Sequence, residues 1–147
     1  MSTDILNQLL AISDLLRRDM ARAFDGTPLT ESRAAVLWTL QTQGPSTQRE
    51  VAAALEISAK HVSTLVDALE QSGYVTRSPH PSDRRAVLLE LTEGAATTMA
   101  AMEREHRELT ATLVDAVEPG DLPAVERALA AVHERLRTLT EAEETAT

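Results

Sequence analysis

The segment from Pro79 to Arg85 combines two prolines with three charged side chains, Asp83, Arg84 and Arg85. Because proline restricts the backbone, these charges are expected at a defined place and not on a flexible loop. A guanidinium held there can enter the minor groove of duplex DNA, and we expect the carboxylate of Asp83 to hold the fork of Arg85. An isolated D-x-R triplet is more often a solvated turn with an incidental ion pair, so its role depends on the elements around it.

A second set of polar residues precedes this segment, on a helix that is predicted to begin at Ser58. Apolar residues from Val62 to Leu69 recur three and four positions apart, which predicts one buried face. The major groove of B-form DNA admits one helix, so the opposite face can reach base edges. The predicted contacts are Ser58, Ala59, Lys60, His61, Ser63 and Thr64 on this helix, Arg49 on the helix before it for the DNA backbone, and Arg77 on the strand after it.

The elements that carry these residues follow the order helix, turn, helix, hairpin, which is that of a winged helix. Thr47 and Glu50 form a T-x-x-E capping box, a typical start of a helix. After Gly73 the apolar period changes from helical to alternating, which predicts a hairpin. In chain order we expect a helix from Ile5 to Phe24, a helix that Thr30 caps and that ends before Gly44, and short helices after Thr47 and from Ser58 to near Gly73. Strands at 74–77 and 86–91 follow, then a helix that Thr92 caps and a last helix after Asp121.

The last predicted helix has its apolar residues in a narrow seam. They are Leu122, Val125, Leu129, Val132, Leu136 and Leu139. Alternating steps of three and four residues are typical of a helix that packs against another helix, and a dimer interface is the natural use. A core helix in a monomer remains the alternative.

Composition limits the possible functions. The 147 residues carry a net charge of -9 and no cysteine, and aromatic residues make up 2%. These values predict a single domain without disulfides, a Cys-based zinc site or a base-stacking platform for single strands. No apolar run could span a bilayer, and we expect a cytoplasmic protein without membrane contact. Residues 46–90 hold five basic and six acidic side chains, whereas residues 103–147 hold five and eleven, so the acid is concentrated outside the predicted winged helix.

Enzymatic chemistry has little support in the sequence, and we expect no catalytic residues and no cofactor. There is no nucleophile with an ordered base and no phosphate-binding glycine loop. His106 and Glu103 share a helix face at i, i+3 spacing, as metal ligands can, but no second histidine joins them. A partly exposed histidine is the simpler interpretation, and no metal site is predicted.

Residues 47–94 resemble the DNA-binding core of MarR-type transcription regulators. The resemblance rests on the D-x-R motif at Asp83 and Arg85, the L-T-x-x-G-type ending from Leu91 to Gly94, and the spacing from the Thr47 cap to the hairpin. The flanking helices agree in number, length and order. The resemblance implies a mainly α fold with a small β-hairpin wing, in which a winged helix at residues 30–92 is flanked by dimerisation helices at 4–25 and 93–142, the whole of residues 1–147 being a single MarR-type domain.

The same resemblance implies a homodimer that binds a pseudo-palindromic operator, usually as a repressor. The implied dimerisation residues are Ile5, Leu9, Ile12, Leu122, Val125, Leu129, Val132 and Leu136. A small aromatic or phenolic effector would release the DNA, and its candidate contacts are Arg17, Phe24, Trp38 and Met99. Thr64 and Ala68 stand where such proteins often carry arginine, and without cysteine the peroxide-sensing subclass is excluded. The alternative function is an acidic winged-helix module that binds a protein partner and has weak or no affinity for DNA.

Overall fold

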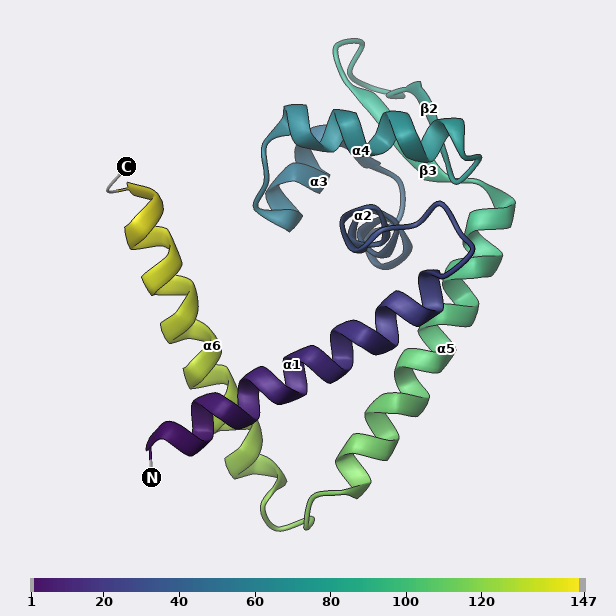
Figure 1. Ribbon diagram of the computed structural model, residues 1–147. Helices are drawn as coiled ribbons and strands as arrows, with labels where there is room; N and C mark the ends of the chain where they lie inside the picture. The colour runs from purple at the N-terminus through teal and green to yellow at the C-terminus, as the bar shows by residue number, and fades with distance from the viewer. Residues whose placement is uncertain (1, 146–147) are drawn as a thin grey trace. The chain divides into compact units, whose positions relative to one another are not determined.

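The computed structural model describes residues 2–145 and divides the chain into two compact units, Met1–Ala101 and Met102–Thr147. Figure 1 labels the elements along the chain. They are α1 (Ser2–Phe24), α2 (Glu31–Gln43), β1 (Ser46–Thr47), α3 (Gln48–Leu55), α4 (Ala59–Gln71), β2 (Val75–Pro79), β3 (Val87–Leu91), α5 (Glu93–Asp115) and α6 (Leu122–Thr145). The expected fold, mainly α with a small β-hairpin wing, is confirmed.

Short polar side chains start the helices of the first unit at the predicted residues. The side chain of Thr30 accepts a hydrogen bond from the backbone N–H of Arg33. Thr47 and Glu50 form the complete capping box, with distances of 3.2 Å from the Glu50 N–H to the threonine hydroxyl and 2.7 Å from the Thr47 N–H to the glutamate carboxylate. Thr92 caps α5 by accepting from the N–H of Ala95. These side chains satisfy backbone donors that have no partner within a helix.

The sheet has the strand order β1-β3-β2, with both pairs antiparallel. The hairpin is longer than predicted on its first side, because β2 continues to Pro79, which pairs with Val87. Proline is compatible with this place at the end of a strand, where no ladder hydrogen bond is required. The short β1 was not predicted: Ser46 and Thr47 pair with Leu89 and Leu88.

An aliphatic core lies between α2, α3, α4 and the sheet. Its largest fully buried side chains are Leu37, Leu69, Leu89, Met99, Val36, Val51, Val62, Val66 and Val75. The predicted inward faces of α2 and α4 are therefore confirmed. The core joins α4 to β2 in one packed body, so the positions of the helix and the hairpin are fixed relative to each other (Figure 1).

Helices α1, α5 and α6 expose apolar side chains in the single chain. Large exposed residues include Ile5, Leu6, Leu10 and Ile12 on α1, Leu113 and Val114 on α5, and Val125, Leu129, Leu136 and Leu139 on α6. Of the predicted dimerisation residues, Leu9, Leu122 and Val132 are half-buried. Within residues 2–145, no helix is long and apolar enough to cross a membrane.

Candidate nucleic-acid interface

Helices α3 and α4 are joined by a tight turn at Glu56 and Ile57. Glu56 adopts the left-handed conformation, with φ 54° and ψ 41°, and the Ile57 N–H donates to the carbonyl of Ala52 at 3.1 Å. Ser58 then caps α4 by accepting from the N–H of His61 at 3.0 Å. Because the connection between the two helices is short and hydrogen-bonded, the turn and the cap fix the orientation of α4 relative to α3.

The amino-terminal half of α4 presents an exposed polar face. Ala59, Lys60, His61 and Thr64 are exposed, whereas Ser63 is half-buried. The hydroxyl of Thr64 donates to the carbonyl of Lys60 within the helix, at 3.2 Å. The sequence therefore predicted the exposure of most residues on this face correctly. Of the predicted contact residues on α4, Ser63 is the least accessible.

Arg77 joins the hairpin to α4. Its guanidinium forms ion pairs with Asp67 at 2.6 Å and with Glu70 at 3.2 Å, and it also donates to the carbonyl of Ser63 at 3.4 Å. The Arg77 side chain is 24% exposed, compared with 60% for Asp67 and 46% for Glu70. Arg77 was predicted to face DNA, but in the structure its fork is occupied by groups on α4. The spacing of ten residues between Asp67 and Arg77 carries no periodic signal that could have revealed the pair.

The tip of the hairpin is held by hydrogen bonds to its own backbone. The Nδ1 atom of His80 accepts from the N–H groups of Ser82 and Asp83, both at 3.1 Å. The carboxylate of Asp83 accepts from the backbone N–H of Arg85 at 2.9 Å. Sequence reasoning missed His80, although a polar side chain two residues before a main-chain N–H is a known turn pattern for aspartate and asparagine.

The predicted contact between Asp83 and Arg85 exists, but it involves a different atom of the arginine. We expected the carboxylate to hold the guanidinium, and among the described residues no ion pair joins the two side chains. A short aspartate side chain reaches the backbone N–H two residues ahead more readily than it reaches the guanidinium at the end of a long arginine side chain. Asp83 therefore positions the backbone of Arg85 and leaves the guanidinium available.

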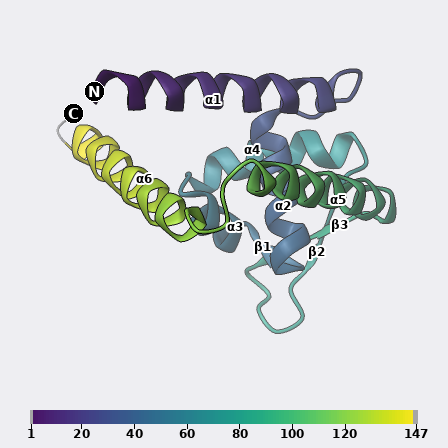
Figure 2. The same ribbon diagram turned by 90° about the horizontal axis from the view of Figure 1, so that it is seen from below.

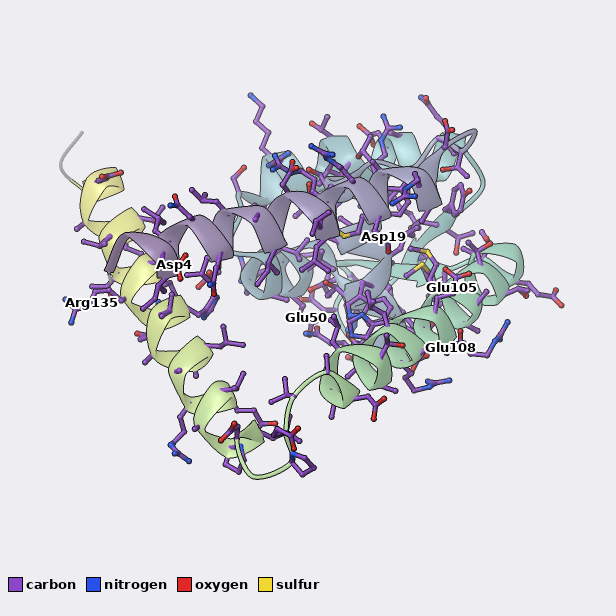
Figure 3. The ribbon with its side chains drawn as sticks, turned by 60° about the horizontal axis from the view of Figure 1, so that its bottom comes forward. Asp4, Asp19, Glu50, Glu105, Glu108 and Arg135 are labelled. Carbon is purple, nitrogen blue, oxygen red and sulfur yellow. The ribbon has the colours of Figure 1, made fainter. Side chains whose placement is uncertain are left out.

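Four cations of the first unit project from the helix-turn-helix and the hairpin without an ionic partner. Within the part of the chain that the structure describes, no ion pair involves Arg49, Lys60, Arg84 or Arg85, and all four are exposed. Much of the acidity of the chain lies outside this region, and Figure 3 labels Asp4 and Asp19 on α1 and Glu105 and Glu108 on α5 as examples. The local charge of the helix-turn-helix and wing is thus more positive than the net charge of the chain suggests.

A pocket of about 380 Å³ lies beside the carboxyl end of α1 and the loop that follows it. It is lined by Arg17, Met20, Ala21, Phe24, Asp25, Gly26, Thr27, Leu29, Thr30 and Glu31. Two of the four predicted effector contacts, Arg17 and Phe24, meet there. Trp38 is half-buried and does not line the pocket, and Met99 is completely buried in the core, so the prediction for Met99 is corrected. Within the described residues, no group of three or more His, Asp or Glu side chains could hold a metal ion.

A helix-turn-helix followed by a β-hairpin that packs on the same core defines this unit as a winged helix. Residues 29–87 match the model of the MarR family. The transcriptional repressor NicR of Pseudomonas putida is 32% identical over 97 residues, which are 66% of this chain and 61% of that protein. The chain matches YpoP of Bacillus subtilis, an uncharacterised regulator, at 27% identity over 74% of this chain and 76% of that protein. Within residues 29–87 the chain thus matches the MarR family, and the relatives named here are described as transcriptional regulators.

Solved structures agree on the fold. FabT of Streptococcus pneumoniae, solved in complex with DNA, has a TM-score of 0.87 at 19% identity, over 95% of this chain and 99% of that one. AbsC, a MarR-family regulator of Streptomyces coelicolor, has a TM-score of 0.75 at 24% identity, over 92% and 94% of the two chains. Identities this low establish the fold alone. The match to NicR spans about three fifths of that protein.

Proposed function

We propose that this regulator binds duplex DNA as a homodimer, with α4 in the major groove and Arg85 in the adjacent minor groove. The observation that carries the proposal is a set of exposed cations at the start of α3, on α4 and at the wing tip, none of which forms an ion pair with another described residue. Phosphates neutralise such cations, and the narrow groove favours guanidinium. The FabT structure, which was solved with DNA, supports the same use of this fold.

The proposed dimer is supported by apolar surface that the single chain leaves exposed. Ile5 and Ile12 on α1 are 60% and 53% exposed, and Leu129 and Leu136 on α6 are 52% and 55% exposed. Two copies that bury these faces would present two α4 helices, so the operator would be pseudo-palindromic, with half-sites about 10 base pairs apart. Sedimentation equilibrium of wild type and Leu129→Glu tests this step. A wild-type monomer at micromolar concentration would refute it.

The experiment for the DNA contact compares Arg85→Ala with wild type on the DNA that flanks the gene. Arg104→Ala is the matched control, because Arg104 is also exposed and lies on α5, outside the helix-turn-helix and wing. Loss of one phosphate-neutralising contact should lower the slope of log affinity against log salt by about one, with folding unchanged. Arg104→Ala should leave the slope unaltered. An identical binding curve for Arg85→Ala would remove the wing from the interface.

The same titration separates DNA binding from the alternative, an acidic module that binds a protein. Binding that depends on phosphates weakens steeply as salt rises, whereas a mainly apolar protein contact does not. A wild-type chain that ignores its flanking DNA even at low salt would favour the protein partner. The exposed cations of the wing and α4 argue for DNA.

We further propose that the regulator is a repressor released by a small aromatic acid bound beside α1. Arg17 and Phe24 both line the pocket there, and an arginine together with an aromatic residue suits a carboxylate attached to an aromatic ring. An effector shifts the equilibrium only if it prefers the form that does not bind DNA. Addition of benzoate should release DNA from wild type at lower concentration than from Arg17→Ala. Equal release from both proteins would exclude this pocket.

A further inference from the structure

The loop between β2 and β3 projects beyond the helices of the first unit and carries Arg84 and Arg85 (Figure 2). Residues 81–85 are all exposed, whereas His80 at the base of the loop is half-buried. The arginines receive little support from packing, so their position depends on the hydrogen bonds of the loop. His80 takes part in more of these bonds than any other side chain of residues 80–86.

The bonds form a continuous path from His80 to Arg85. The imidazole Nδ1 accepts from the N–H groups of Ser82 and Asp83 at 3.1 Å, and the Ser82 hydroxyl lies 3.3 Å from the same nitrogen. Asp83 then accepts from the Arg85 N–H through its carboxylate, at 2.9 Å, and from the Ala86 N–H through its carbonyl, at 3.2 Å. The His80 N–H closes the loop on the carbonyl of Ala86 at 3.2 Å.

The donors in this path determine the protonation state of the ring. A backbone N–H can only donate, so Nδ1 must carry its lone pair and the ring proton of neutral His80 must be on Nε2. A doubly protonated imidazole has no acceptor. Protonation of His80 therefore breaks both bonds to the Ser82 and Asp83 N–H groups at the same time.

We propose that His80 is the positioning residue of the wing, and that its neutral imidazole holds Arg85 in the conformation that enters the minor groove. Acidification releases the turn and weakens DNA binding. The inference rests on the proposed function of the wing, and it adds to that function a named residue and a dependence on pH. Asp83 acts in series with His80, since it is held by the imidazole and holds Arg85 in turn.

The charged groups near His80 lie on the loop, on β3 and on α4. On the loop they are Asp83, Arg84 and Arg85. On β3, the charged side chain is that of Glu90, a residue paired with Thr76 near the far end of the hairpin. From α4, the hairpin meets Asp67 and Glu70, and both carboxylates are paired with Arg77. The carboxylates outside the loop are thus distant along the hairpin or already paired. The interactions that hold the ring of His80 are therefore mainly its hydrogen bonds with the loop backbone.

The test uses two replacements of His80. His80→Asn supplies a carbonyl oxygen as a non-titrating acceptor for the same N–H groups, as asparagine does in Asx turns. His80→Ala supplies none. At pH 8 we expect His80→Ala to bind DNA about tenfold more weakly than wild type, and His80→Asn to bind within about twofold, in the range that the loss of one or two hydrogen bonds gives.

The pH dependence is read as a difference between two proteins, so that the contribution of His61 on α4 is common to both. Affinities are compared at pH 8 and pH 5.5, which lie on either side of the pH range in which imidazoles in general gain a proton. Wild type should lose about tenfold more affinity than His80→Asn over this interval. His61 is the same in both proteins and cancels from the comparison. Equal pH profiles for wild type and His80→Asn would overturn the proposal.

A measurement without DNA distinguishes failure of this inference from failure of the DNA-binding proposal. In free wild type, the amide signals of Ser82, Asp83 and Arg85 should shift together and exchange faster as pH is lowered from 8 to 5.5. The same amides should be exposed at all pH values in His80→Ala and protected at all pH values in His80→Asn. Amides that are insensitive to both substitutions would refute the role of His80, whether or not Arg85→Ala weakens DNA binding.

Discussion

Replacing Arg77 by alanine should separate a structural role of this arginine from a direct contact with DNA. The guanidinium joins β2 to α4 through Asp67, Glu70 and the carbonyl of Ser63. If this bridge is its function, Arg77→Ala lowers stability and also leaves two carboxylates on α4 without a counter-charge. If Arg77 instead neutralises a phosphate, the substitution lowers the salt slope of DNA binding and leaves stability unchanged.

The expected loss of stability follows from the exposure of the groups. Both carboxylates are about half exposed, so each ion pair should stabilise the fold by no more than a solvent-exposed pair does, about 0.2–1 kcal/mol. The arginine stem is mostly buried, and its removal adds lost packing. We therefore expect Arg77→Ala to lower the free energy of unfolding by about 1–2 kcal/mol, which corresponds to roughly 5 °C in melting temperature for a chain of this size.

Urea unfolding at fixed protein concentration, followed by the fluorescence of Trp38, measures this loss. Arg49→Ala is the matched control, since Arg49 is exposed and has no ion pair within the described residues. It should leave stability within about 0.5 kcal/mol of wild type and lower the salt slope by about one. For Arg77, adding Asp67→Asn to Arg77→Ala should restore part of the lost DNA affinity, because a carboxylate near the phosphates is removed.

The opposite pattern would refute the bridge. In that case Arg77→Ala would unfold at the wild-type urea concentration, its salt slope would fall by about one, and Asp67→Asn would bring no recovery. Arg77 would then belong to the surface that touches DNA, as the sequence alone suggested.

Three further predictions concern single interactions. Thr47→Ala should lower the free energy of unfolding by about 1 kcal/mol in the Trp38 assay, because the capping box is lost, and an unchanged midpoint would contradict this. Glu56→Gly should raise it by about 0.5 kcal/mol, since glycine tolerates the left-handed conformation, and a loss would show that the glutamate side chain matters more than the strain. The hydrogen bond and charge of Arg137 lower the pKa of Glu134, so Arg137→Ala should raise that pKa in a carboxyl NMR titration. Any stability from this pair is present at neutral pH and is lost as pH falls through the lowered value.

The sequence predicted best what is encoded by neighbouring residues. The caps at Thr30, Thr47 and Thr92 depend on contacts three residues apart, and all were predicted correctly. The buried face of α4 depends on helical periodicity and was also correct. Each of these features arises within one or two turns of chain, where residue type and spacing are sufficient.

Features that require distant segments to meet were not predicted. Strand β1 exists because Ser46 and Thr47 pair with β3 about forty residues later, and two residues are too few to show an alternating pattern. The bridge from Arg77 depends on how β2 packs on α4, which no spacing reveals. The full set of residues that line the pocket beside α1 could not be predicted either. Met99, for example, fits the helical pattern equally well whether it lines a pocket or fills the core.

The acidity of the chain is compatible with DNA binding because local pairing, and not net charge, determines what phosphates meet. At physiological salt, exposed charges are screened beyond about 8 Å, so distant acidic residues count for little. The acidic groups that matter most are the two on α4 itself, Asp67 and Glu70, and Arg77 pairs with both. Within the described residues, Lys60 on α4 then takes part in no ion pair with these carboxylates. The wing has a similar arrangement, since the carboxylate of Asp83 accepts from a backbone N–H and, in the described part of the chain, no ion pair involves the guanidinium of Arg85.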